Sequence, residues 1–227
     1  MGYLLLEGGS EFGGRMSDPD LRAIDLAGGV EVPICILPTA AAPDKNDKRA
    51  GKNGIRWFQS LGAKNVFSVD VIDSDSANDE SLVVSIRTAS LIYMLGGFPR
   101  HLADTLAHSL AWRAVLDAYN QGAVLAGSSA GAMVICEHYY DPFERRLLRG
   151  LNLIPNACVI PHHNSFGKAW TGHLEKVMHG ATLIGIDEQT GMINNADGTW
   201  QVYGAGAVTL YRNGKISHYT QGETFSL

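Results

Sequence analysis

The serine at position 129 stands between two glycines, in the segment Gly127-Ser128-Ser129-Ala130-Gly131. This is the pattern G-x-S-x-G, which holds a nucleophilic serine on a tight turn between a strand and a helix. Glycine on either side lets the backbone turn sharply without a side-chain clash. The apolar run AVLA precedes the segment and the helix-compatible run AMVIC follows it. We therefore interpret Ser129 as a nucleophile, with an ordinary glycine-containing turn as the alternative.

A serine hydroxyl needs a neighbouring base to react. Of the eight histidines, the pair His162-His163 in CVIPHHNSF follows an aliphatic run, so we expect it at the end of a buried strand. His218 is the other candidate. No further metal-binding side chains accompany the pair at ligand spacing, so we expect no metal site. The sequence favours one histidine of the pair as the base.

Two more segments could complete a hydrolytic site. GIDEQTG places Asp187 and Glu188 after a strand-like run, where a carboxylate could orient the imidazole and stabilise its charged form. The strand-like run LIYML opens into Gly96-Gly97, whose backbone could approach a ligand closely. Backbone N–H groups from this turn and from Ala130 could then stabilise an oxyanion.

Continuous apolar runs of strand length must position these residues. They cover residues 3–6, 32–37, 65–71, 90–95 and 123–126, and helix-like segments such as 49–61 separate them. Continuous rather than alternating runs indicate an α/β fold with a mostly parallel, doubly wound sheet and helices on both faces. From about residue 183, short strands and tight turns such as Arg212-Asn213-Gly214 indicate antiparallel C-terminal strands.

Length and composition favour a single domain over residues 1–227. The net charge is −5 without a basic stretch, which argues against a nucleic-acid partner or an anionic membrane surface. No apolar run approaches the roughly 18 residues of a membrane-spanning helix. The segment GGSEFGGR lacks the residues of a phosphate-binding loop. We expect a cytoplasmic protein, a monomer or a homodimer, with no cofactor and no membrane partner.

Together these motifs resemble the family of serine peptidases that contains dipeptidase E and cyanophycinase. The resemblance runs through nearly the whole chain, in GGSEF, ILPTAAAP, LIYMLGGFP, LAGSSAGAMV, VIPHHNSF and IGIDEQT. It implies a fold like that of class I glutamine amidotransferases, with serine in place of the usual cysteine. It also implies that the chain hydrolyses small peptides through an acyl-enzyme.

Carried over by position, the resemblance implies Ser129 as nucleophile and His162 as base, with Gly97 and Ala130 as oxyanion donors. Glu188 is the acid expected from similarity to cyanophycinase. Dipeptidase E instead takes an aspartate from the segment after the nucleophile helix, where this chain has Asp141 and Glu144.

The same resemblance bears on the substrate. We expect substrate contacts from four residues around the triad, namely Gly96, Phe98, His163 and Asn164. Cyanophycinase-like proteins carry a glutamine after the two glycines and Asp-Gln before the histidine, where this chain has Phe98-Pro99 and Ile160-Pro161. These differences do not favour cyanophycin as the substrate. Glu11 could meet a substrate amino group or cap a helix.

Two other functions remain open at this point. An α/β-hydrolase esterase is also built around G-x-S-x-G, with its triad in the order serine, acid, histidine. Its candidates here are Ser129, Asp187 and His218. The second alternative is an amidotransferase-like domain that binds a metabolite or partner without catalysis.

Overall fold

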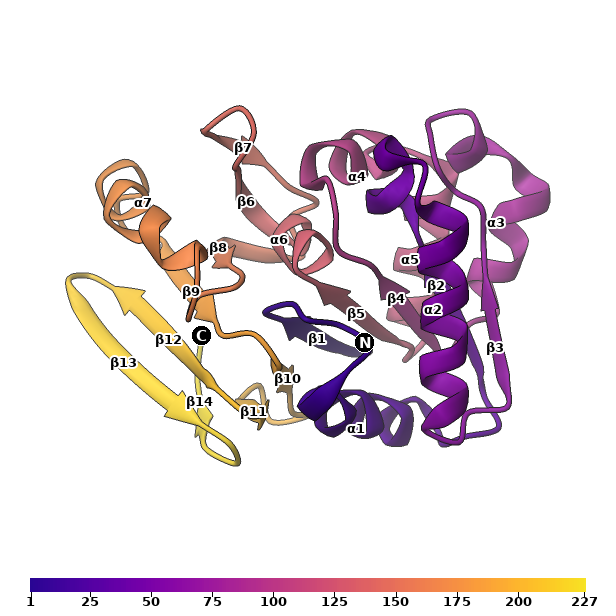
Figure 1. Ribbon diagram of the computed structural model, residues 1–227, viewed down its shortest axis with the longest axis horizontal. Helices are drawn as coiled ribbons and strands as arrows, with labels where there is room; N and C mark the ends of the chain where they lie inside the picture. The colour runs from indigo at the N-terminus through magenta and orange to yellow at the C-terminus, as the bar shows by residue number, and fades with distance from the viewer.

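The larger sheet in the computed structural model, which describes residues 1–227, has eight strands (Figure 1). In their order across the sheet they are β14 (Thr224–Phe225), β11 (Trp200–Gly204), β10 (Thr190–Asn194), β1 (Tyr3–Glu7), β5 (Val124–Ser128), β4 (Leu91–Met94), β2 (Pro33–Leu37) and β3 (Asn65–Ser68). The last five run parallel, whereas β10, β11 and β14 are antiparallel to their neighbours. The carboxyl ends of β1, β4 and β5 therefore meet at one edge.

A second sheet of six strands lies beside the first, at the left of Figure 1. Its strands, again in spatial order, are β13 (Lys215–Thr220), β12 (Ala207–Arg212), β9 (Thr182–Ile186), β8 (Ile154–Ile160), β6 (Cys136–Asp141) and β7 (Arg146–Arg149). β6, β8 and β9 run parallel, and the remaining pairs are antiparallel. His162 and His163 follow the carboxyl end of β8, and Asp187 and Glu188 follow that of β9. This sheet therefore positions both the histidine pair and the acidic pair.

Helices cover both faces of the larger sheet. The α-helices are α1 (Ser17–Ala27), α2 (Asp47–Ser60), α3 (Glu80–Arg87), α4 (Pro99–Leu106), α5 (Leu110–Asn120), α6 (Ala130–Ile135) and α7 (Thr171–Val177). Short 3-10 helices are η1 (Gly14–Met16), η2 (Thr39–Asp44), η3 (Ser76–Asn78) and η4 (Gly167–Trp170). No helix has the length and apolar composition to cross a membrane.

The alternation of side chains along β2 explains why its apolar run is continuous. Ile34 and Ile36 pack in the cluster that contains Phe58 of α2, whereas Cys35 packs in the cluster that contains Val115 of α5. Successive residues of a strand point to opposite faces, so a strand covered on both sides needs apolar residues throughout. The α/β architecture predicted from the sequence is confirmed in this respect.

The second sheet is the feature that the sequence does not predict. The predicted antiparallel C-terminal strands are present, because β10 to β14 pair antiparallel with their neighbours. They are divided between two sheets, however: β10, β11 and β14 join the larger sheet and β12 and β13 the smaller one, where β9 pairs parallel to β8. The hairpin through Asn213-Gly214 does form, between β12 and β13. Short apolar strands give no sequence signal for which sheet they join, because long-range pairing decides it.

Candidate active site

Ser129 lies between the end of β5 and the start of α6, on a backbone with φ 48° and ψ −107°. This conformation is rare for a residue with a side chain and costs about 1–3 kcal/mol. The turn is tight on both sides: a Cβ on Gly131 would overlap the carbonyl oxygen of Met94. The N–H of Ser129 donates a 3.0 Å hydrogen bond to the carbonyl of Glu7, which ties the turn to β1.

The imidazole of His162 faces the hydroxyl of Ser129. The Oγ of Ser129 lies 3.0 Å from Nε2 of His162, and Nδ1 lies 2.9 Å from Oε1 of Glu188. An ionised carboxylate can only accept, so the proton sits on Nδ1 and leaves Nε2 free to accept from the serine. The structure thus joins Ser129, His162 and Glu188 in one line of hydrogen bonds.

The backbone around His162 is fitted closely to this position. His162 itself has φ 49°, and its N–H donates a 2.7 Å hydrogen bond to the carbonyl of Gly8. Gly9 has φ 115°, and a Cβ there would overlap the imidazole ring at Cε1. The first glycine-rich loop therefore leaves room for the imidazole because it has no side chain at position 9.

Glu188 is held from both directions. Its N–H donates a 3.0 Å hydrogen bond to Oδ1 of Asn164, and its carboxylate accepts a 3.3 Å hydrogen bond from the hydroxyl of Ser165. The hydrogen bond from His162 is the main cause that lowers the pKa of Glu188 below its ordinary value. The carboxylate therefore carries its charge at neutral pH, next to the imidazole that it orients.

Gly97 lies opposite the serine turn, in the loop between β4 and α4. Its N–H donates no hydrogen bond within the protein, although its neighbour Phe98 donates to the carbonyl of Ala40. Ala130 is the first residue of α6, so its N–H has no partner within that helix. Gly97 and Ser129 both line a pocket of about 430 Å³.

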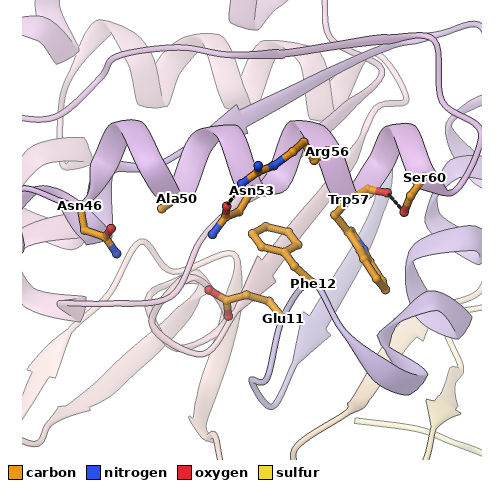
Figure 2. Close-up of a pocket in the computed structure, with 8 residues that line it drawn as sticks. All are labelled: Glu11, Phe12, Asn46, Ala50, Asn53, Arg56, Trp57 and Ser60. Carbon is orange, nitrogen blue, oxygen red and sulfur yellow. Dashed lines mark hydrogen bonds between the residues drawn. The ribbon is translucent and has the colours of Figure 1, made fainter.

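Glu11 connects the turn at Gly96 with the turn at Ser128. Its carboxylate accepts hydrogen bonds from the N–H of Gly96, at 3.2 Å, and from the hydroxyl of Ser128, at 2.7 Å. Glu11 also forms the base of a groove of about 510 Å³ under α2, with Phe12 pointing toward the helix (Figure 2). It neither caps a helix nor lines the pocket at Ser129.

The other candidate acids lie elsewhere. Asp141 accepts hydrogen bonds from the N–H groups of Phe143 and Glu144. Glu144 forms ion pairs with Arg100 and with Arg146, the latter at 2.6 Å. Neither carboxylate hydrogen-bonds to His162, whereas Glu188 does.

The residues expected around the triad divide into two groups. His163 does not reach the pocket, because it is only 4% exposed and hydrogen-bonds to Asp187, at 3.3 Å, and to the hydroxyl of Tyr211, at 2.9 Å. Asn164 holds Glu188, and Gly96 holds Glu11, as described above. Phe98 stacks on Phe143 beside the pocket, with ring centroids 4.9 Å apart.

The alternative esterase triad is not assembled. Asp187 bonds to His163 and to the N–H of Ala207. His218 lies on β13 and contacts the hydroxyl of Thr209 at 2.8 Å. Ser129 hydrogen-bonds to neither of them, so the order serine, acid, histidine has no counterpart here.

Sequence reasoning missed the aromatic side chains around Ser129. Phe143, Phe166 and Trp170 line the pocket, and the ring of Phe166 stacks on that of His162 with centroids 4.6 Å apart. The signal available was a cluster of aromatics shortly after the histidine pair, in HHNSFGKAW. That pattern alone does not tell an exposed aromatic from a buried one.

Comparisons with known proteins show the family to which the chain belongs. The model of Peptidase family S51 matches residues 4–201. A cyanophycinase from Nostoc sp. is 28% identical over 203 residues, which are 85% of this chain and 67% of that protein. A cyanophycinase from Geminocystis herdmanii is 27% identical over 213 residues, covering 87% and 75%. The chain thus spans about two thirds to three quarters of these relatives.

Two solved structures are similar to this chain. A peptidase from an acI-B1 actinobacterium has a TM-score of 0.89 at 29% identity, over 100% of this chain and 97% of that one. A putative peptidase E protein from Listeria monocytogenes has a TM-score of 0.63 at 17% identity, over 98% and 100%, which shows a shared fold. Since the family model matches most of the chain, this protein belongs to peptidase family S51 and is a serine-type peptidase.

Proposed function

We propose that this chain hydrolyses the peptide bonds of small peptides, with Ser129, His162 and Glu188 as its catalytic triad. The observation that carries the proposal is the line of hydrogen bonds from Ser129 Oγ to His162 Nε2, 3.0 Å, and from His162 Nδ1 to Glu188 Oε1, 2.9 Å. Both Ser129 and His162 have positive φ, a strain that proteins retain at functional sites.

The reaction begins when Oγ of Ser129 attacks the peptide carbonyl and Nε2 of His162 takes the hydroxyl proton. Glu188 stabilises the imidazolium through Nδ1. The N–H groups of Gly97 and Ala130 stabilise the negative oxygen of the tetrahedral intermediate. The C–N bond then breaks, and His162 gives its proton to the leaving amine.

The acyl-enzyme is resolved by water. His162 removes a proton from the water molecule, which attacks the acyl carbon in the same oxyanion site. Collapse of the second intermediate breaks the ester bond, and the proton on His162 returns to Oγ of Ser129. The products are a carboxylic acid and an amine, and the site is restored.

The size of the pocket supports small peptides as substrates. About 430 Å³ of space at Ser129 is within the range of pockets that bind small ligands. The pocket holds a few residues rather than a folded chain.

A screen of dipeptides and tripeptides, with the release of free amino acids as the readout, tests the proposal. We expect turnover by the wild type and its loss in Ser129→Ala and in His162→Ala. His218→Ala is the matched control, because this histidine lies on β13 away from Ser129, and it should keep full activity. Turnover that survives in Ser129→Ala contradicts the mechanism. Absence of turnover in all four proteins contradicts small peptides as the substrates.

A further inference from the structure

The pocket at Ser129 has a mostly apolar lining. Its lining includes Met133, Phe143, Phe166 and Trp170 beside Ser129 and His162. Apart from Ser129 and His162, every lining residue is apolar, aromatic or glycine. No lysine, arginine, aspartate or glutamate contributes to it.

Two of the aromatic side chains at this pocket are exposed. Phe143 is 66% exposed and Phe166 is 56% exposed, and they are the only two exposed phenylalanines of the chain. Both are held by stacking: Phe143 lies on Phe98, and Phe166 lies on His162 and at 5.7 Å from Trp170. Their faces therefore stay presented at the pocket, where an apolar ligand would remove them from water.

The exposed Lys168 of η4 lies outside the lining of the pocket, and several other charged groups nearby have partners within the protein. Arg100 and Arg146 both form ion pairs with Glu144, and the carboxylate of Asp141 accepts two backbone N–H groups. An acidic substrate side chain inside the pocket would thus find no cation in the lining, and a basic one would find no carboxylate there. Burying an unpaired charge is costly, so the pocket disfavours both.

The groove under α2 makes a contrast with this pocket. Asn46, Asn53 and Arg56 face it, with the carboxylate of Glu11 at its base (Figure 2). The groove contains neither Ser129 nor His162, and the two cavities share no residue. Polar groups are thus available in the neighbourhood, but not where the scissile bond must lie.

We propose that the residue next to the scissile bond is a large apolar or aromatic one, such as leucine, methionine or phenylalanine, whose side chain fills the pocket formed by Met133, Phe143, Phe166 and Trp170. This inference rests on the proposed function, because it places the reacting carbonyl at Ser129. It names the substrate class: short peptides with an apolar residue at the cleavage point.

Matched tripeptides test the inference. In one series only the residue before the cleaved bond changes, among phenylalanine, leucine, alanine, aspartate and arginine, and in a second series only the residue after it. In one of the two series we expect kcat/KM for phenylalanine or leucine to exceed that for aspartate and arginine by about 10-fold or more. Equal rates in both series, or a preference for aspartate or arginine, would overturn the inference.

A pair of variants ties the preference to the pocket. Phe143→Ser should lower the ratio of kcat/KM for the phenylalanine peptide to that for the aspartate peptide by about 10-fold. Ile216→Ser is the matched control, since Ile216 is also 66% exposed but lies on β13, and its ratio should equal that of the wild type. An unchanged ratio in Phe143→Ser contradicts the assignment of the pocket.

Labelling with a fluorophosphonate separates this inference from the proposed function. A protein that is labelled at Ser129 and cleaves peptides without an apolar preference refutes the specificity and keeps the mechanism. A folded protein that is neither labelled nor active refutes both.

Discussion

The hydroxyl of Ser128 donates a 2.7 Å hydrogen bond to the carboxylate of Glu11, whose other oxygen accepts from the N–H of Gly96. Ser128 immediately precedes Ser129, the proposed nucleophile, and Gly96 immediately precedes Gly97, a proposed oxyanion donor. A single side chain from the first loop thus sets the distance between the nucleophile turn and the oxyanion turn.

Replacement of Glu11 by glutamine should therefore lower kcat more than it changes KM. The amide of Glu11→Gln removes the negative charge from both hydrogen bonds, and with its oxygen toward the N–H of Gly96 its NH2 group faces Ser128, whose hydroxyl must then accept instead of donate. We expect a fall in kcat of about 10-fold to 100-fold, the cost of small displacements in an active site. Steady-state kinetics on a peptide substrate measure it. Glu31→Gln is the control, since Glu31 forms only an exposed ion pair with Lys64, and kcat equal in the two variants would refute the role of Glu11.

The identity of the acid can be tested in the same way. Glu188→Gln removes the charge next to His162 and permits the wrong imidazole tautomer, so we expect kcat to fall by about 10²-fold to 10⁴-fold. Glu144→Gln breaks ion pairs with Arg100 and Arg146 but no contact with His162, and it should change kcat little. The opposite order of effects would assign the acid to the segment after α6.

The first glycine loop offers a test by addition of a single methyl group. In Gly9→Ala the new Cβ would overlap the ring of His162, and φ at this position is 115°. We expect the imidazole to be displaced from Ser129 and kcat to fall about 100-fold. Gly13→Ala is the matched control, because no atom lies within 4 Å of the Cβ site and the backbone is extended there. Wild-type kinetics in Gly9→Ala would show that the imidazole does not need this contact.

Stability should decrease between pH 5 and pH 7 because of a buried carboxyl pair. Glu7 and Asp20 are fully buried and interact with each other. Tyr93 donates a hydrogen bond to Glu7, Trp57 donates one to Asp20, and the charge of Glu11 is nearby. Each keeps one carboxylate oxygen without a donor, and one shared proton would satisfy both. Burial is the main cause that raises the pKa of Asp20 to about 7, and it raises the pKa of Glu7 as well.

The sign of the pH effect follows from these pKa values. Both carboxyls ionise near pH 4 in the unfolded chain, but the folded chain keeps a proton up to about pH 7. The contribution of this pair to the free energy of unfolding is therefore fully present below pH 4. It is lost as the pH rises through 7. For one proton the loss is about 1.4 kcal/mol per pH unit, measurable by urea unfolding. Asp20→Asn should flatten the dependence of the free energy of unfolding on pH. Asp25→Asn is the control, because Asp25 is exposed on the same helix, and it should leave this dependence unchanged. A wild-type stability that is constant or rises from pH 5 to pH 7 contradicts the shared proton.

The sequence predicts the nucleophile turn well, because its signals are local. Gly127 and Gly131 are required by contacts within a few residues and with β4, and the continuous apolar run before Ser129 reports a strand covered on both faces. The same reasoning places Gly97 and the histidine pair at strand ends. These features depend on nearby residues, which a single sequence displays.

The residues around the triad could not be predicted from local sequence signals. His162 and His163 are adjacent, and residues on opposite sides of a strand end have the same sequence context, so only the fold shows that His163 turns to Tyr211. The aromatic pocket combines Phe143, from the loop between β6 and β7, with Phe166 and Trp170, after β8. Their meeting depends on the second sheet, for which the sequence contains no local signal.

The central claim is that Ser129 is made nucleophilic by His162, and peptide mapping after exposure of the folded protein to a fluorophosphonate tests it most directly. We expect one adduct in the wild type, on the peptide that contains Ser129, none in Ser129→Ala, and a strongly reduced yield in His162→Ala. An adduct on a different residue, or an equal yield with and without the imidazole, would contradict it.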